Sequence, residues 1–148
     1  MQNILPPVLP GVLICYNQTM FLNKRKLSSD PKRLGRWGEN HCEKFLKRKG
    51  LKFLTRNFSC KTGEIDLVMV APDKTIVFVE VRTKADDNFS TPESSITSVK
   101  QARLSRTARY FLAANQIEDR PFRFDIVTIV LGQKGRPKLN HYENAFVP

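Results

Sequence analysis

One stretch constrains the fold more than any other: two apolar runs, joined by a short turn, whose charges lie at their outer ends. It covers residues 63–84 and reads GEIDLVMVAPDKTIVFVEVRTK. Runs rich in Val, Ile and Phe favour strands, and the Pro-Asp-Lys sequence at 72–74 favours a turn. We therefore predict an antiparallel hairpin made of Gly63–Ala71 and Thr75–Arg82.

The register of this hairpin decides whether its acidic residues meet. Side chains alternate between the two faces of a strand, and directly opposed residues share a face. Asp66 therefore faces Glu80 if Val70 pairs with Ile76, which requires a loop of odd length such as residues 72–74. A two-residue loop would offset the two carboxylates, unless a bulge restored the register.

In the first register, Asp66 and Glu80 oppose each other, and like charges opposed across a sheet are destabilising. A cation between them would relieve the repulsion, and Mg²⁺ or Mn²⁺ suits carboxylate oxygens. Arg82 then lies on the same face as the ion and its phosphate ligand. The alternative is a solvated sheet edge on which Glu64 and Arg82 form a cross-strand pair. Apolar residues on both faces of the strands favour burial, where unpaired acids are costly.

Composition indicates a soluble domain that binds a polyanion. The chain has 148 residues, of which 41% are hydrophobic, and 25 Lys and Arg against 14 acids give a net charge of +11. Such an excess attracts nucleic acid or an anionic membrane. The three cysteines form no CxxC pair, so we expect no disulfide framework or zinc site, and a reducing cytoplasm.

The N-terminal segment differs from the rest because its first nineteen residues carry no charge. Prolines interrupt it, it lacks the positive start of a signal peptide, and it is too short to span a membrane. We expect residues 1–29 to be a disordered extension, or an upstream start with Met20 as the true initiator. Residues 30–148 then form a single domain with no membrane partner.

A first helix is predicted before the strands. Asp30 caps it with Pro31 in the first turn, and Gly50 ends it after a run of cations. On this helix Glu39 lies at the border of the apolar stripe, where it can face the sheet. Glu43 lies farther round, and we expect it to be a solvated charge.

A second helix is predicted to begin after Ser95 or Thr97 and to run to about Asn115, following a polar loop at residues 85–95. We expect its apolar residues to pack on the sheet: Val99, Leu104, Ala108, Phe111 and Leu112. Its cations occupy much of the remaining circumference and favour contact with phosphate: Lys100, Arg103, Arg106 and Arg109.

Further strands are predicted at residues 51–59 and 122–131. The acid of the latter, Asp125, either supports the site or satisfies a neighbouring arginine, and residues 138–148 hold a short strand at most. The order is αβββαβ, which predicts an α/β fold with a mixed sheet flanked by helices.

An acid, a spacer and a Glu-X-Lys-like pattern on the next strand, in this element order, resemble the PD-(D/E)XK nuclease superfamily with its restriction-endonuclease-like core. More closely, GEIDLV at 63–68, VFVEVRTK at 77–84 and KQARL at 100–104, together with Asn57, resemble the YraN family of uncharacterised endonuclease-like proteins.

The resemblance implies roles for individual residues. Asp66 and Glu80 correspond to the metal-binding acids, Glu39 to an acid that the first helix commonly contributes, and Gln101 to a polar residue near the site.

Arg82 replaces the superfamily's lysine. An arginine cannot serve as a base, but it can orient water or stabilise charge on phosphate. Lys84 is an alternative source of the ammonium, although Arg82 is one pleat nearer the acids.

We therefore predict a metal-dependent nuclease that hydrolyses phosphodiester bonds with Mg²⁺ or Mn²⁺. DNA is expected rather than RNA, and kinship with junction-resolving nucleases suggests branched DNA and a homodimer. The alternative is a nucleic-acid-binding protein that keeps the nuclease fold without activity, for which the change from lysine to Arg82 is the main support. A third class, a partner for an anionic protein or membrane, has only the net charge in its favour.

Overall fold

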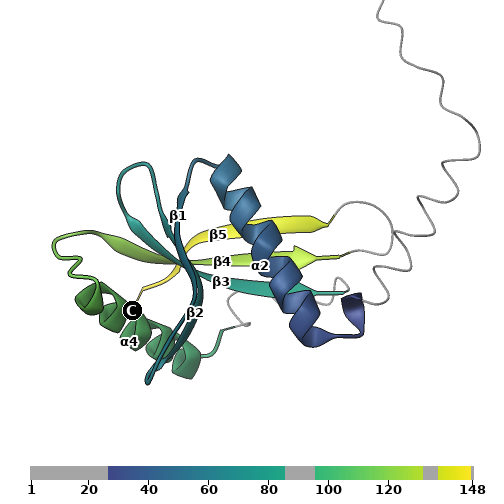
Figure 1. Cartoon of the computed structure of the whole chain (residues 1–148), viewed down its shortest axis with the longest axis horizontal. Coiled ribbons are helices and arrows are strands. Elements are labelled where there is room, and N and C mark those ends of the chain that lie inside the picture. The colour runs from purple at the N-terminus through teal and green to yellow at the C-terminus, as the bar shows by residue number, and fades with distance from the viewer. Residues whose placement is uncertain (1–26, 86–95, 132–136, 148) are drawn as a thin grey trace, which may run out of the picture.

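The computed structural model describes residues 27–85, 96–131 and 137–147 (Figure 1). Its elements are α2 (Pro31–Arg48), β1 (Lys52–Cys60), β2 (Gly63–Val70), β3 (Ile76–Lys84), α4 (Ser98–Ala114), β4 (Phe122–Val130) and β5 (Lys138–Phe146). Residues 1–26 of the predicted extension, residues 86–95 of the predicted polar loop, and residues 132–136 and 148 lie outside the described residues.

The described strands form one mixed sheet in the order β1-β2-β3-β4-β5. Strands β3 and β4 are parallel, and the other neighbouring pairs are antiparallel. Figure 1 shows β1 and β2 running steeply across the other three strands. The α/β class and the αβββαβ order are confirmed.

The prediction of a short C-terminal strand at most is wrong, because β5 is nine residues long and pairs with β4. Its sequence, KLNHYENAF, is polar and lacks the apolar run that identifies the other strands. It is extended because β4 offers an otherwise open edge, and because the Asn144 N–H donates a hydrogen bond to Asp125 Oδ1 at 2.9 Å. Both reasons are contacts with β4, which the local sequence of residues 138–146 does not specify.

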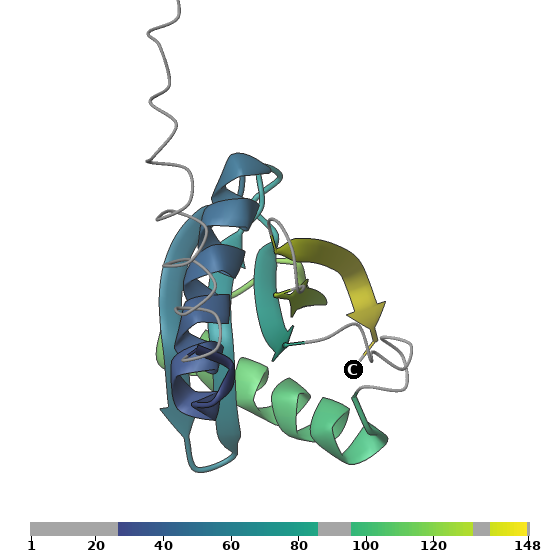
Figure 2. The ribbon, with the colours of Figure 1, turned by 90° about the vertical axis from the view of Figure 1, so that its right-hand side faces the viewer.

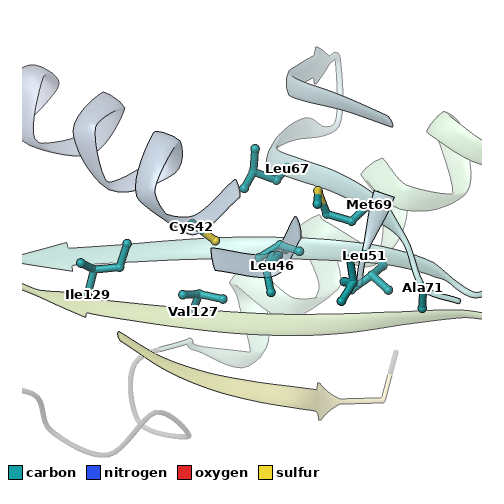
Figure 3. Packing of buried hydrophobic residues seen from close by; sticks show 10 residues of the cluster. Cys42, Leu46, Leu51, Leu67, Met69, Ala71, Val127 and Ile129 are labelled. Carbon is teal, nitrogen blue, oxygen red and sulfur yellow. The ribbon is translucent and has the colours of Figure 1, made fainter. Parts of the chain in front are cut away.

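The two helices pack on opposite faces of the sheet (Figures 1 and 2). Figure 3 shows the cluster in which α2 places Cys42 and Leu46 against the strands. On the sheet side this cluster contains Leu67, Met69, Val77, Val79, Val127 and Ile129. A second cluster joins Leu104, Ala108 and Phe111 of α4 to Ile65, Val68, Ile76, Phe78 and Phe124.

The packing predicted for α4 is confirmed except at Val99, which is 67% exposed. At 100° per residue, Val99 lies on the opposite side of the helix from Ala108, which is fully buried. The helix begins after Thr97, whose hydroxyl accepts a hydrogen bond from the Lys100 N–H.

Helix α2 has the predicted ends. Asp30 caps its N-terminus by accepting a hydrogen bond from the Arg33 N–H at 3.1 Å. At the other end Gly50 has a φ of 92°, and the Leu51 N–H reaches the Leu46 carbonyl at 3.1 Å. This left-handed ending is one that glycine adopts without steric cost.

Glycine at position 38 sets how closely α2 approaches β3. A Cβ added to Gly38 would lie 1.8 Å from Oγ1 of Thr83, whereas a Cβ on Gly35, one turn earlier, would meet nothing within 4 Å. The helix is therefore seated directly on the strand that carries Glu80 and Arg82.

Candidate active site

The register of the β2–β3 hairpin is the one that brings Asp66 and Glu80 together. Val70 pairs with Ile76 and Leu67 with Val79. The connecting loop is the odd-length segment 72–74, whose last residue, Lys74, has a left-handed φ of 72°. The predicted register is therefore confirmed.

The backbone pairing of β2 with β3 ends at the pair Leu67–Val79, and beyond it the Asp66 side chain accepts a hydrogen bond from β3. Its Oδ2 accepts a hydrogen bond from the Val81 N–H at 2.8 Å. The carboxylate is thus held against β3, one residue from Glu80. Because the Asp66 carboxylate, and not a backbone carbonyl of β2, accepts from the Val81 N–H, β2 and β3 need not stay paired at this end of the hairpin.

Helix α4 closes the space between the parting strands, and Gly63 permits the contact. A Cβ on Gly63, where φ is 148°, would lie 2.9 Å from Cγ of Arg103. The turn is also linked to the helix by the hydroxyls of Thr62 and Thr107, which lie 3.0 Å apart. The glycine that opens GEIDLV is therefore explained by a close approach of the β2 backbone to α4.

The result is a pocket of about 530 Å³ that contains the acid pair. Asp66 and Glu80 line it together with Lys100 and Arg103 of α4 and residues 59–64 of the β1–β2 turn. Three acids, Glu64, Asp66 and Glu80, thus share one pocket with three cations, Lys61, Lys100 and Arg103. Cationic side chains in a pocket can bind the negatively charged oxygens of a phosphate ester.

The two carboxylates have different environments. Glu80 is only 7% exposed, and its Oε1 forms ion pairs with Lys100 Nζ and, at 3.3 Å, with Arg82 Nε. The pKa of Asp66 is raised from 3.8 to about 7, mainly by burial and next by the negative charge of Glu80, against the opposing hydrogen bond from Val81. Perturbed acids in a pocket are typical of functional sites.

Glu39 lies near this site without joining it. It is half-buried on α2 and accepts a hydrogen bond from the side chain of Asn57 at 3.2 Å, and its charge also raises the pKa of Asp66. Asn57 has a left-handed φ of 50°, which asparagine tolerates better than most residues.

The side chains of the pocket suit a magnesium site with two carboxylate ligands. Within residues 27–85, 96–131 and 137–147, no three His, Cys, Asp or Glu side chains are close enough to hold a metal ion. Mg²⁺, however, is commonly bound by one or two carboxylates, with water and substrate phosphates completing its shell. Asp66 and Glu80 could supply those two carboxylates, and a divalent ion would relieve the repulsion that raises the pKa of Asp66.

The other residues singled out in the sequence are placed as follows. Glu64 is exposed and lines the pocket. Arg82 contacts Glu80 but is not among the described residues that line the pocket. Lys84 is exposed at the end of β3. Gln101 donates a hydrogen bond to the Ile96 carbonyl at 3.2 Å and lines a separate hollow on the other flank of α4.

The four cationic side chains of α4 do not lie on one continuous surface, because they line two separate pockets. Lys100 and Arg103 line the pocket with the acids, whereas Arg106 and Arg109 line the separate hollow of about 400 Å³ beside Val147. Sequence reasoning placed all four on a phosphate-tracking face. The contact of Lys100 with Glu80 depends on how the helix lies against β3, which periodicity does not specify.

The prediction that Glu43 is a solvated charge is wrong. Its side chain is buried and forms ion pairs with Arg56 of β1 and, at 2.6 Å, with Lys47. The flank of α2 that carries Glu43 is covered by β1. The helical pattern shows which residues share a flank, but not which strand lies beside it.

Asp125 satisfies a neighbouring arginine, which was one of the two alternatives. Arg123 lies 3.0 Å away and His141 Nε2 2.8 Å away. Burial opposes its ionisation, but the hydrogen bonds from His141 and Arg123 outweigh burial and lower the pKa of Asp125. It shares the α2 face of β4 with Val127, so the sheet separates it from the pocket on the α4 face.

The α/β fold, the αβββαβ order and the acid pair at the open end of the hairpin define a protein with a nuclease-like core. A model of the uncharacterised protein family UPF0102 matches residues 38–129. The chain belongs to this family, which confirms the resemblance to the YraN proteins.

Individual relatives match over most of their length. A UPF0102 protein of Pelobacter propionicus is 39% identical over 118 residues, which cover 79% of this chain and 84% of the relative. One of Bifidobacterium longum is 40% identical over 118 residues, covering 78% and 94%. One of Caldicellulosiruptor saccharolyticus is 39% identical over 126 residues, covering 84% and 100%.

No helix within the described part of the chain is long and apolar enough to cross a membrane.

Proposed function

We propose that this protein is a metal-dependent nuclease that hydrolyses phosphodiester bonds in nucleic acid, with DNA as the first substrate to test. The observation that carries the proposal is the pair formed by Asp66 and Glu80 in a pocket that also contains Lys100 and Arg103. Burial and mutual repulsion make this pair a strong attractor for a cation, and the net charge of +11 favours a polyanionic substrate.

In the proposed reaction, Asp66 and Glu80 would hold Mg²⁺ or Mn²⁺. Bound there, the ion would supply an activated water and offset negative charge on the phosphate. The hydrogen bond from Val81 fixes the orientation of Asp66, and Arg82 holds the carboxylate of Glu80. Arg103 and the cation of the β1–β2 turn, Lys61, line the pocket where they can bind flanking phosphates.

The chemistry is a hydrolysis. The attacking water gives up a proton as its oxygen forms a bond to phosphorus, the bond from phosphorus to the departing sugar oxygen breaks, and the departing oxygen takes up a proton. The negative charge that develops on the phosphate oxygens would be stabilised by the cations of the pocket, which are already in place and need no reorganisation during the reaction.

The test is cleavage of labelled single-stranded, duplex and branched DNA, and of RNA, with Mg²⁺, Mn²⁺ or EDTA. We expect cutting only with metal, and a loss of at least about 100-fold in Asp66→Asn and in Glu80→Gln. Glu118→Gln, which removes an exposed carboxylate from outside the pocket lining, is the matched control. Cutting that persists in EDTA, or in both pocket variants, would refute the proposal.

A second candidate, a nuclease-fold protein that binds nucleic acid without cutting, also has an observation in its favour. Among the described residues no third acidic, His or Cys side chain lies close enough to complete a metal site with Asp66 and Glu80, and Glu80 already has two cationic partners. This candidate predicts salt-sensitive binding that is unchanged in Asp66→Asn and Glu80→Gln, with no cleavage in any metal.

A further inference from the structure

The side chain of Lys100 is the cation most directly placed on the acid pair. Lys100 lies in the first turn of α4, where its N–H is held by the Thr97 cap at 3.3 Å. Four residues later, on the same flank, Leu104 is buried and also lines the pocket. The helix therefore directs Lys100 toward β3, and its Nζ donates to Glu80 Oε1.

Two cations compete for this one carboxylate oxygen, but they reach it differently. Arg82 Nε lies 3.3 Å from Glu80 Oε1 and comes from the same strand. Lys100 approaches it from α4 and lines the pocket together with Asp66 and Glu80. Arg82 is not among the described residues that line the pocket. Of these two described cations, Lys100 is the one that both contacts Glu80 and lines the pocket that would receive a phosphate.

An ammonium in this position stands where a divalent ion would bind. Both are attracted to the carboxylate of Glu80, so a divalent ion held by Asp66 and Glu80 would compete with Lys100 Nζ for its oxygen atoms. The Lys100 backbone stays fixed by the helix cap, and its flexible four-carbon stem keeps Nζ within the same pocket after displacement.

We propose that Lys100 is the catalytic ammonium of this site. It is the counter-ion of Glu80 in the metal-free protein. When the metal binds, it moves onto the phosphate under attack, where it donates hydrogen bonds to an oxygen that gains negative charge. This assignment rests on the proposed nuclease function and gives Lys100 the role for which the sequence pattern favours Arg82. A compact ammonium with three donors suits the task, because it can exchange a carboxylate for a phosphate oxygen by a small rotation.

Metal binding tests the competition without any cleavage. Calorimetric titration with Mn²⁺ alone compares the wild type with Lys100→Met, Lys100→Arg and Glu118→Gln. Removing a charge that competes at contact distance should tighten Mn²⁺ binding about threefold to tenfold in Lys100→Met. Lys100→Arg, which keeps the charge, and the control should stay within about twofold of the wild type.

Single-turnover cleavage at saturating Mn²⁺ tests the catalytic role, with Arg82→Met as the comparison variant because it removes the other partner of Glu80. We expect Lys100→Met to cut about 100-fold to 1,000-fold more slowly although it binds metal more tightly, whereas Arg82→Met loses less than about tenfold. Nucleic-acid affinity in EDTA should change by less than about threefold in both variants.

The outcomes separate the two proposals. A wild type that cuts with metal, together with a Lys100→Met variant that cuts equally well or binds Mn²⁺ more weakly, would overturn the assignment of Lys100 and leave the nuclease standing. A wild type that cuts nothing in any metal would overturn both. The expected result is tighter Mn²⁺ binding combined with slow cutting in Lys100→Met, a smaller loss of less than about tenfold in Arg82→Met, and unchanged cutting in Glu118→Gln.

Discussion

Replacement of Asp66 by asparagine should make the protein more stable at alkaline pH. The pKa of Asp66 is about 7 in the folded protein against 3.8 for an unperturbed carboxyl. The folded state therefore binds this proton more tightly than the unfolded chain does, and the free energy of unfolding falls as pH rises from about 4 to about 7. Asparagine keeps an oxygen for the Val81 N–H but carries no charge at any pH.

The magnitude follows from the two pKa values. Their difference corresponds to about 4 kcal/mol at a pH well above 7. Because the side chain is partly exposed, we expect the stability advantage of Asp66→Asn to grow by about 2 to 4 kcal/mol between pH 4 and pH 8.

The assay is urea unfolding in EDTA at several pH values, with Glu118→Gln as the control. The control removes an exposed carboxylate, so its free energy of unfolding should stay within about 0.5 kcal/mol of the wild type throughout. A variant at position 66 that is less stable than the wild type at pH 8, or whose difference from it does not change with pH, would refute the reasoning.

Three further expectations concern stability. Gly38→Ala should lower the free energy of unfolding by about 1 to 3 kcal/mol because its methyl group would clash with Thr83. Gly35→Ala, in open space on the same helix, should raise it by about 0.5 to 1 kcal/mol. Thermal unfolding measures both variants, and equal effects would contradict the close approach of α2 to β3. Glu43→Ala should cost about 1 to 3 kcal/mol in urea unfolding because Glu43 is buried and doubly paired, and a cost near zero would mean that it is solvated after all. Mn²⁺ at 100 times its dissociation constant should stabilise the wild type by about 2.7 kcal/mol but leave Asp66→Asn unchanged, and equal thermal shifts in the two would place the metal elsewhere.

The candidate site could be predicted in part because its central feature is local. Asp66 and Glu80 belong to one hairpin, and the three-residue loop at 72–74 sets which side chains face each other. The left-handed φ of Lys74 is compatible with that loop length. The sequence left two loop lengths open; once the loop is known to cover residues 72–74, a pairing rule with a period of two residues places Asp66 opposite Glu80 without knowledge of the rest of the chain.

Other features depended on which elements become neighbours. The burial of Glu43 follows from β1 lying beside α2. Two partners of Asp125, His141 and Asn144, come from β5, whose polar sequence does not predict a strand. Periodicity assigns residues to a face of a helix or strand, but the element that covers that face is chosen by packing over the whole domain.

The sequence by itself therefore determined the caps of α2, the C-terminal end of α4 and the strand alternation that places Asp66 opposite Glu80 when the loop covers residues 72–74, because caps, turns and strand alternation act over a few residues. Only the tertiary structure decided that α4 brings Lys100 onto Glu80 and that Gly63 lets the β1–β2 turn close the pocket. Those contacts join residues that are 20 or more positions apart. They exist because two helices must bury their apolar flanks on opposite faces of one sheet.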